Sequence, residues 1–243
     1  LLDGAVQSVY PAIRWFDTRT EAIASAWEPF GRERIYRITG INPNPVASIT
    51  KMQWIKRYVP EAWARARLWI PIAGFISLKL TGTARAPWTN ACRSMAFDLN
   101  RRDWSEEILA EAGIERSLLA EPIRPGEQIG ALTAAAAAAT GLKEGTPVFA
   151  GGVDYACGTF ATGIIRPGQM LDSTGTSEQL LAILDAPEIS SASMEKNFTS
   201  VAYVVNDAYY IMGMIVASGG IFEWFKNTFA CESFDLLVDE AAR

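Results

Sequence analysis

Histidine is missing from the sequence: none of the 243 residues is a histidine. Its absence excludes every Ser–His or Cys–His catalytic relay, every histidine-ligated zinc site and a histidine general base. Any acid–base chemistry must therefore use Asp, Glu, Lys, Tyr or Cys side chains.

Cysteine and basic charge are also scarce. The three cysteines (Cys92, Cys157 and Cys231) are far apart and form no CxxC pair, which argues against a disulfide framework or zinc knuckle and fits a reducing, cytoplasmic compartment. Lys and Arg total 22 against 27 Asp and Glu, so no basic surplus points to nucleic acid. No signal peptide is evident at the start, and the apolar stretch 201–222 is broken by Asn206-Asp207 and three glycines. We expect neither nucleic acid nor membrane as a partner.

Apolar residues make up 49% of the chain, which is enough for a sizeable core without disulfides or metals. The chain begins at Leu1 without an initiator methionine and ends at Arg243 inside a helical pattern. Both ends are therefore expected to be cut.

The first part of the chain is predicted to be mainly helical. A helix is expected from Asp17 or Thr18 to about Trp27, and Thr18 has the spacing of a capping box with Glu21. A second helix is expected over 46–58 and ends before Pro60. Further helices are expected between Pro71 and Gly82, from a capping box at Asp103 and Glu106 to Gly113, and as a closely packed alanine helix over 134–139. A short β-rich run is expected over 9–15.

Strands are predicted to dominate from residue 147 onward. Residues 147–150 resemble a buried strand, 169–173 and 178–183 a pair of strands joined by a turn, and 200–212 a hairpin turning at Asn206-Asp207. Helices are expected again over 219–229 and 233–242. The change of pattern predicts two domains, over 1–165 and 166–243.

Asp154 is the first candidate for chemistry. It ends a predicted strand, directly after two glycines that allow other atoms close to the backbone. A carboxylate there could accept a proton from a substrate hydroxyl, although the local pattern by itself favours an Asp that caps the following helix.

The turn Thr174-Gly175-Thr176-Ser177 is the second candidate. A glycine flanked by hydroxyls between two strands could direct N–H groups and hydroxyls toward a phosphate, and the alternative is an ordinary hairpin turn. Neither GxxxxGK[ST] nor GxGxxG occurs in the sequence.

Trp15, Asp17 and Arg19 form the third candidate. An acid accepts hydroxyl protons and an indole packs on C–H groups, so the pair suits a polyol; the alternative is a helix cap with a solvated arginine. Cys157 lies near a predicted helix start, but without histidine to activate it a place in the core is favoured.

Taken in order, these segments resemble the FGGY family of carbohydrate kinases. The similarity runs in register through nearly all of the chain, and no single segment is highly specific. Its main segments are 12–20, 80–82, 89–98, 145–148, 151–154 and 172–177, with Lys51, Trp54 and Trp104 between them.

The resemblance implies an α/β, actin-like ATPase (ribonuclease H-like) fold with two domains around a cleft, incomplete at both ends. It implies transfer of the ATP γ-phosphoryl group to a sugar hydroxyl with Mg²⁺, with Asp154 as catalytic base. Trp15 and Asp17 would line the sugar site, and Thr174, Gly175 and Thr176 would contact phosphate. No residue of the chain is assigned as a metal ligand. Phosphoryl transfer of this kind requires that the reactants are positioned and that a side chain accepts the hydroxyl proton. It does not require a histidine.

The substrate class stays open between ketoses and polyols. Tyr155 after Asp154 is more similar to the pentulose and hexulose kinases than to the glycerol kinases, whereas Pro87-Trp88 replaces the Asp-aromatic pair of many members. The family's first phosphate-binding segment would precede Leu1 and its adenosine-binding segment would follow Arg243, so this chain alone is expected to be inactive. The alternatives are a non-catalytic actin-fold sugar-binding or regulatory protein and a glycerol- or erythritol-type kinase. A homodimer is left open.

Overall fold

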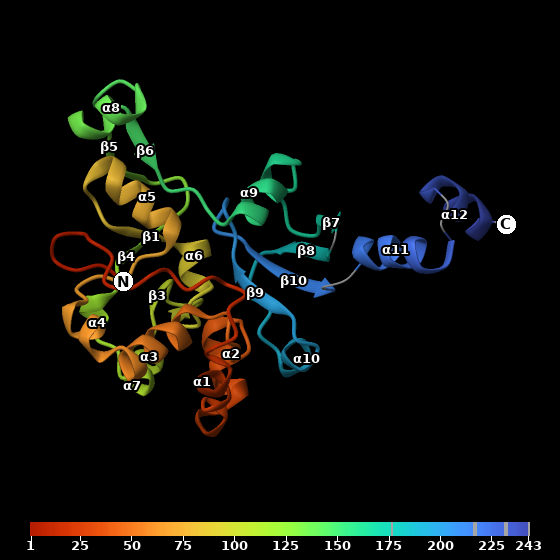
Figure 1. The fold of residues 1–243 in the computed structure, drawn as a ribbon, viewed down its shortest axis with the longest axis horizontal. Coiled ribbons are helices and arrows are strands. Elements are labelled where there is room, and N and C mark those ends of the chain that lie inside the picture. The colour runs from red at the N-terminus through yellow and green to blue at the C-terminus, as the bar shows by residue number, and fades with distance from the viewer. Residues whose placement is uncertain (176, 216–217, 231–232, 243) are drawn as a thin grey trace.

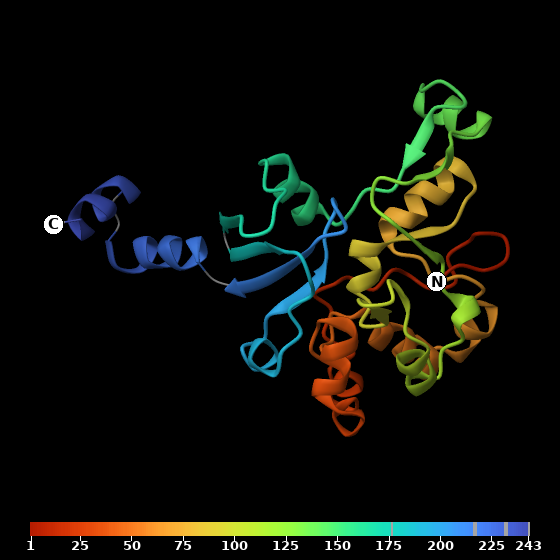
Figure 2. The same ribbon diagram turned by 180° about the vertical axis from the view of Figure 1, so that it is seen from behind.

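The computed structural model describes residues 1–243 except 176, 216–217, 231–232 and 243. The fold is mixed α/β. Figures 1 and 2 show helices surrounding the N-terminal end, a twisted sheet beside them, and two helices extending away at the C-terminal end. No helix in the described ranges is long and apolar enough to cross a membrane.

Helices make up most of the first part, and short strand pairs join them. The strands β1 (Arg85–Pro87) and β4 (Glu121–Ile123) pair in parallel, and the antiparallel pairs are β2 (Phe97–Asp98) with β3 (Asp103–Trp104) and β5 (Gln128–Ala131) with β6 (Pro147–Phe149). The helices are α1 (Glu21–Ser25), η1 (Glu28–Phe30), α2 (Arg32–Thr39), α3 (Ser48–Tyr58), α4 (Pro60–Arg65), α5 (Ile72–Thr81), α6 (Trp88–Cys92), α7 (Glu106–Ala112), η2 (Arg116–Leu118) and α8 (Ala134–Thr140).

The second part is built on a four-stranded antiparallel sheet in the order β7-β8-β10-β9. Its strands are β7 (Met170–Thr174), β8 (Glu178–Leu184), β9 (Thr199–Ala202) and β10 (Tyr209–Ile215). The helices around and beyond the sheet are α9 (Asp154–Ala161), α10 (Ser191–Glu195), α11 (Gly219–Phe225), the π-helical turn η3 (Lys226–Ala230) and α12 (Phe234–Ala241).

Local signals place several element ends where the sequence predicts them. Thr133 accepts the Ala136 N–H at 3.2 Å and Gly141 ends α8 in the left-handed region, so both caps of the alanine helix are confirmed. Pro71 and Gly82 bound α5 as expected. The hairpin turn is also confirmed, because Asn206 and Asp207 both have positive φ, at 58° and 52°.

Two predicted caps are wrong. The helix after Asp17 starts only at Glu21, and Thr20 precedes it without capping, because its hydroxyl donates to the Pro45 carbonyl at 2.8 Å. Before α7 the capping oxygen belongs to Ser105, which accepts the Ile108 N–H at 3.3 Å. Asp103 lies in β3 instead and pairs with Arg116.

Three further expectations fail because of tertiary surroundings. Residues 9–15 form no strand, since Pro11 has no N–H and the Val9 N–H bonds back to Leu1 O at 3.1 Å. In α8 only Ala136 is buried, so the alanine helix is not closely packed; it lies with β5 and β6 at the outer edge seen in Figure 1. The strand β6 lies at the same outer edge, so it is not the buried strand that the sequence predicts, and Phe149 is 55% exposed.

One core joins the two parts of the chain. Fully buried residues such as Phe97 and Trp104 belong to the same cluster as Tyr203 and Tyr210 from the sheet. The Tyr209 hydroxyl donates to the Leu99 carbonyl at 3.1 Å across this junction. The sheet therefore packs on the helical part through side chains that are far apart in the sequence, which a short-range sequence pattern does not predict.

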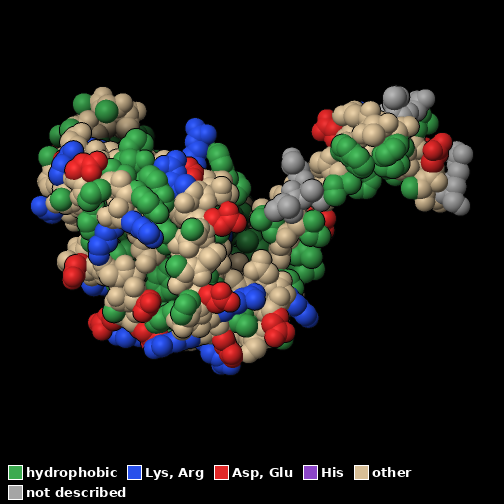
Figure 3. Space-filling view, turned by 60° about the horizontal axis from the view of Figure 1, so that its bottom comes forward, with side chains coloured by type: hydrophobic (Ala, Val, Ile, Leu, Met, Phe, Trp, Pro, Cys, Tyr) green, Lys and Arg blue, Asp and Glu red, His purple; other side chains and the backbone are tan. Residues whose placement is uncertain are grey.

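The C-terminal arm, by which we mean α11, η3 and α12, carries many exposed apolar side chains. Figure 3 shows them gathered on one side of the arm. They are Ile221, Phe222, Trp224, Phe225, Phe229, Phe234, Leu236 and Val238.

Candidate functional site

The Asp154 side chain lies at the first position of α9, at the surface of the molecule. The strand β6 ends at Phe149, the chain turns through Gly151 and Gly152, and Val153 rather than Asp154 occupies the cap position. The Tyr155 N–H donates to Asp154 Oδ1 at 2.8 Å. The carboxylate is exposed, so its second oxygen is available to a ligand.

Helix α6 holds the turn before Asp154 in place. The Val153 N–H donates to the Thr89 hydroxyl oxygen at 2.9 Å, although the two residues are 64 positions apart in sequence. At Gly152 a Cβ atom would lie 2.5 Å from Val204 Cγ1 and 2.9 Å from Thr89 Oγ1. Only glycine leaves room for this approach, so the turn is clamped between α6 and the segment after β9.

Tyr155 anchors the start of α9 to the sheet. Its hydroxyl and that of Tyr210 on β10 are 2.8 Å apart, and their rings meet edge to face with centroids 6.0 Å apart. Burial raises the pKa of Tyr210 well above its ordinary value, so this hydroxyl stays protonated at neutral pH. The backbone beside Asp154 is therefore fixed on both sides.

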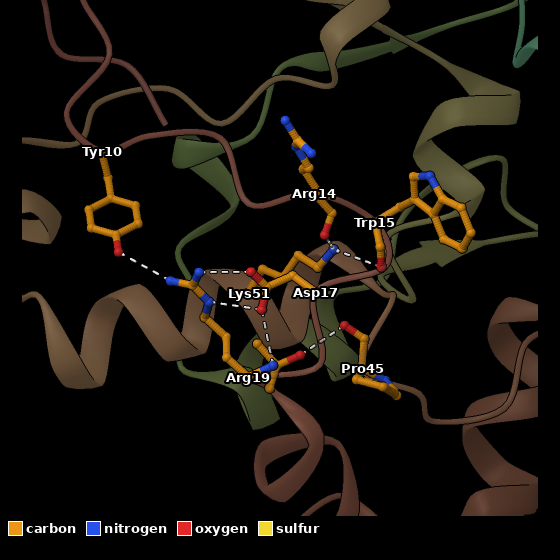
Figure 4. A network of polar contacts seen from close by, with 8 residues as sticks. Tyr10, Arg14, Trp15, Asp17, Arg19, Pro45 and Lys51 are labelled. Atoms are coloured by element: carbon orange, nitrogen blue, oxygen red, sulfur yellow. Dashed lines mark hydrogen bonds and ion pairs between the residues drawn. The ribbon is translucent and has the colours of Figure 1, made fainter.

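The second group of candidate residues surrounds Asp17 (Figure 4). Arg19 grips the Asp17 carboxylate with two hydrogen bonds, from Nε to Oδ1 at 2.9 Å and from Nη2 to Oδ2 at 2.7 Å. The Arg19 N–H adds a third bond to Oδ1 at 3.1 Å. Arg19 also donates to the Tyr10 hydroxyl at 3.3 Å and lies over the Trp54 ring, 4.9 Å from its centroid.

These contacts keep Asp17 ionised. Hydrogen bonds from the Arg19 side chain and backbone lower the pKa of Asp17 below its ordinary value. Its carboxylate accepts bonds on both oxygens, so a sugar hydroxyl would share these acceptors with Arg19. The pair is exposed and contributes little to stability.

Trp15 lies two residues before Asp17, in the turn closed by the bond from the Asp17 N–H to the Arg14 carbonyl at 3.2 Å, and its side chain points away from Asp17 in Figure 4. Trp15 is 67% exposed, and its ring meets Phe16 edge to face at 5.4 Å between centroids. One indole face is free to pack on the C–H groups of a ligand.

Lys51 on α3 supports the backbone before Asp17, and the sequence did not mark it as a site residue. Its ammonium donates to the carbonyls of Arg14 at 2.6 Å and Trp15 at 3.3 Å. Burial lowers the pKa of Lys51, and the nearby Asp17 carboxylate offsets part of that effect. The available signal was a lysine beside Met52 on the apolar side of a helix, where a charge needs a specific partner.

The turn between β7 and β8 is described except for Thr176, which lies outside the described residues. The Gly175 N–H donates to the Ser177 carbonyl at 2.8 Å, and the Thr174 hydroxyl donates to Asp172 Oδ1 at 3.3 Å. In this structure both donors bond within the hairpin. A phosphate would have to exchange these bonds for its own.

The candidate residues form separate groups. Within the described part of the chain, no hydrogen bond joins Asp154 to Trp15, to Asp17 or to the Thr174-Gly175 turn. No three His, Cys, Asp or Glu side chains among the described residues gather closely enough to hold a metal ion. Cys157 is half-buried on α9, one turn after Asp154.

Comparison with known sequences identifies relatives along the whole chain. Residues 1–161 match the family described as "FGGY family of carbohydrate kinases, N-terminal domain". The chain is 31% identical to xylulose kinase from Bacillus subtilis over 98% of its length and 47% of the relative's. It is also 31% identical to L-fuculokinase from Escherichia coli, over 99% of the chain and 51% of the relative. The chain thus spans about half the length of these relatives.

Solved structures share the fold. A structure named as a xyloylose kinase from Brucella ovis is 26% identical, with a TM-score of 0.87 over 93% of this chain and 46% of that one. Xylulose kinase from Rhodospirillum rubrum is 24% identical and superposes with a TM-score of 0.91 over 99% of this chain and 48% of that one. The arrangement of helices and sheet is therefore the actin-like fold of these sugar kinases.

Proposed function

Because the chain belongs to the FGGY family of carbohydrate kinases, we propose that it takes part in ATP-dependent phosphorylation of a sugar or polyol hydroxyl. The observation that carries the proposal is the exposed Asp154 carboxylate on a turn clamped by Thr89. A base for phosphoryl transfer needs this combination of access and fixed position.

In the proposed reaction Asp154 accepts the proton of the substrate hydroxyl. The substrate oxygen forms the new bond to the γ-phosphorus while the bond from that phosphorus to the β,γ-bridging oxygen breaks and ADP leaves. The free oxygen of the carboxylate, opposite the one bonded by the Tyr155 N–H, receives the proton. The Thr89 and Tyr210 contacts keep this oxygen in place during the transfer.

Trp15 and Asp17 are proposed to bind the sugar. The exposed indole offers a flat surface to C–H groups, and the ionised Asp17 offers acceptors to hydroxyls. Arg19 would orient that carboxylate, and Lys51 would hold the backbone of the Trp15 turn.

The hairpin residues Thr174, Gly175 and Thr176 are proposed to contact ATP phosphates. The support is their place in the family pattern and the supply of hydroxyl and N–H donors in one turn. Mg²⁺ stays a prediction from the family, as does the division of the chain into domains 1–165 and 166–243. The cytoplasm is the proposed compartment.

A ketose is the proposed acceptor, because the relatives above are named for the ketoses xylulose and L-fuculose. The test uses a longer protein containing this chain, since the chain spans 47% of the length of the xylulose kinase. ATP-dependent phosphorylation is measured with D-xylulose, L-fuculose, D-ribulose, erythritol and glycerol. Turnover of a ketose supports the proposal, and turnover of glycerol or erythritol alone would assign the polyol alternative. The 243-residue chain alone is expected to be inactive.

Replacement of Asp154 tests the base. Asp154→Asn should lower kcat by about 10²–10⁴-fold and leave the Kd for the sugar nearly unchanged. The matched control is Asp185→Asn, which makes the same change at another exposed position and should have no effect. Equal turnover by the Asp154 variant would remove Asp154 from the role. Sugar binding without turnover by the unaltered longer protein would favour a non-catalytic sugar-binding protein.

A further inference from the structure

The turn between β9 and β10 is held by two arginines from the helical part. Arg124, directly after β4, donates to both oxygens of the Asp207 carboxylate, from Nε to Oδ1 at 2.6 Å and from Nη2 to Oδ2 at 2.8 Å. Arg102, in the turn between β2 and β3, has its Nη1 3.2 Å from Asp207 Oδ1 and donates from Nη2 to the Asp207 carbonyl at 2.8 Å. Each acceptor oxygen of Asp207 is therefore bound by a guanidinium.

Arg102 is itself fixed by two aromatic rings. Its guanidinium carbon lies 5.1 Å from the centroid of the Trp88 ring and 5.4 Å from that of the Tyr209 ring. Its Nε also donates to the Tyr209 hydroxyl at 3.2 Å. A single exposed ion pair contributes little, but a bidentate pair within a network of charges has a defined geometry. The β9–β10 turn is therefore held at one place, beside the start of α6.

The same hairpin contacts the segments before and after α9. A Cβ atom at Gly152 would lie 2.5 Å from Val204 Cγ1, so the turn that leads to Asp154 packs directly on the segment between β9 and β10. Beyond α9, the Ile165 carbonyl accepts a hydrogen bond from the Asn206 amide at 3.1 Å. The position of this hairpin therefore limits where the turn before Asp154 can lie.

We propose that Asp207 is a positioning residue. By binding Arg102 and Arg124 it holds the β9–β10 turn in place, which keeps Val204 against Gly152 and so fixes the backbone that leads to Asp154. The consequence for catalysis rests on the proposed function, in which Asp154 is the base. The effect on the backbone does not rest on it.

Cys157 reports on this contact in the chain itself. A Cβ atom at Gly152 would lie 3.4 Å from Cys157 Sγ, so the half-buried thiol lies at the junction that Asp207 is proposed to hold. Asp207→Asn removes the charge and keeps a residue type that tolerates the positive φ of this position. Iodoacetamide should modify Cys157 in this variant about 3- to 10-fold faster than in the unaltered chain, because the junction opens more often.

Further variants show whether the ion pair is the cause. Asp185→Asn, the same change at another exposed position, should leave the rate unchanged. Arg124→Gln should also accelerate modification of Cys157, and the double variant with Asp207→Asn should react no faster than Asp207→Asn alone. Cys92 should stay unmodified in every variant. An unchanged rate at Cys157, additive effects in the double variant, or faster modification of Cys92 as well would each overturn the proposal.

Kinetics of the longer protein separate positioning from stability. Asp207→Asn should lower kcat about tenfold and leave KM for the sugar unchanged, because Trp15 and Asp17 lie on a different turn. A merely stabilising ion pair would lower Tm without changing kcat of the folded protein, so an unchanged kcat would overturn the role. If the unaltered longer protein phosphorylates none of the tested substrates, the kinase proposal fails, and the Cys157 rates still decide whether Asp207 fixes the turn.

Discussion

The backbones of Gly40 and Ser200 are in direct contact where the helical part packs on the sheet. The Ser200 N–H donates to the Gly40 carbonyl at 2.8 Å, and a Cβ atom at Gly40 would lie 1.7 Å from the Ser200 carbonyl oxygen. Gly40 ends α2 with φ at +69°, a conformation that side chains rarely adopt. The same glycine therefore ends a helix and allows β9 to approach it.

Replacement of Gly40 should destabilise the chain strongly. Gly40→Ala adds left-handed strain of roughly 1–2 kcal/mol, and the clash with Ser200 should bring the total loss above about 3 kcal/mol. The measurement is denaturant unfolding. Gly82→Ala is the matched control, because Gly82 also ends a helix at positive φ but has no atom within 4 Å of its added Cβ. Equal losses in the two variants would show that the contact with Ser200 adds nothing.

Thr89 should affect catalysis through Asp154, if Asp154 is the base. Thr89→Val removes the acceptor of the Val153 N–H but keeps the volume of the side chain. We expect kcat of the longer protein to fall by about 10- to 100-fold with little change in KM for the sugar. Thr89→Ser keeps the hydroxyl and should recover most of the activity. A loss in Thr89→Ser as large as that in Thr89→Val would contradict a role for the hydrogen bond.

Arg19 should set the pKa of Asp17. The Arg19 side chain lowers the pKa of this carboxyl below 3.8, so the ion pair is fully formed above that pH and is lost as the pH falls through the lowered pKa. In Arg19→Gln the pKa should rise toward 3.8. An NMR titration of the Asp17 carboxyl carbon in both proteins measures the shift. An unchanged midpoint would mean that Arg19 does not hold the carboxylate in solution.

Cys92 should be inert in the folded chain. Burial raises the pKa of its thiol to about 12, so almost no reactive thiolate forms at pH 8, and the side chain is fully buried. Iodoacetamide treatment followed by peptide mass spectrometry should find Cys92 unmodified in the native chain and modified after denaturation. The half-buried Cys157 is the internal comparison and should react faster. Rapid native modification of Cys92 would contradict the packing around α6.

The ends of helices and strands that could be predicted are set by residues close together in the sequence. Thr133 and Gly141 cap α8, and the Asn206-Asp207 turn joins β9 and β10, with bonds that span only a few residues. The misplaced cap at Asp103 shows the limit of this reasoning. Asp103 instead pairs with Asp98 in the β2–β3 hairpin and its carboxylate contacts Arg116, so the capping bond comes from Ser105.

The candidate site likewise has residues that the sequence predicts and contacts that it does not predict. The sequence alone predicts Asp154, Trp15 and Asp17 as candidate site residues, because their order along the chain follows a family pattern, and it places Arg19 beside Asp17. It could not show that Asp17 binds Arg19 through both oxygens or that the Gly175 N–H bonds within its own turn. These contacts depend on side-chain and turn geometry that residue types do not specify.

The sequence by itself determined the family, the alternation of helices and strands, and the absence of any histidine chemistry, because each depends on residue identity and spacing. Only the tertiary structure decided what holds the candidate base and the Trp15 turn. Thr89 reaches Val153 across 64 positions, and Lys51 reaches the Arg14 carbonyl across 37. Partners so far apart meet only when the core has formed, since burial of the whole apolar surface brings them together.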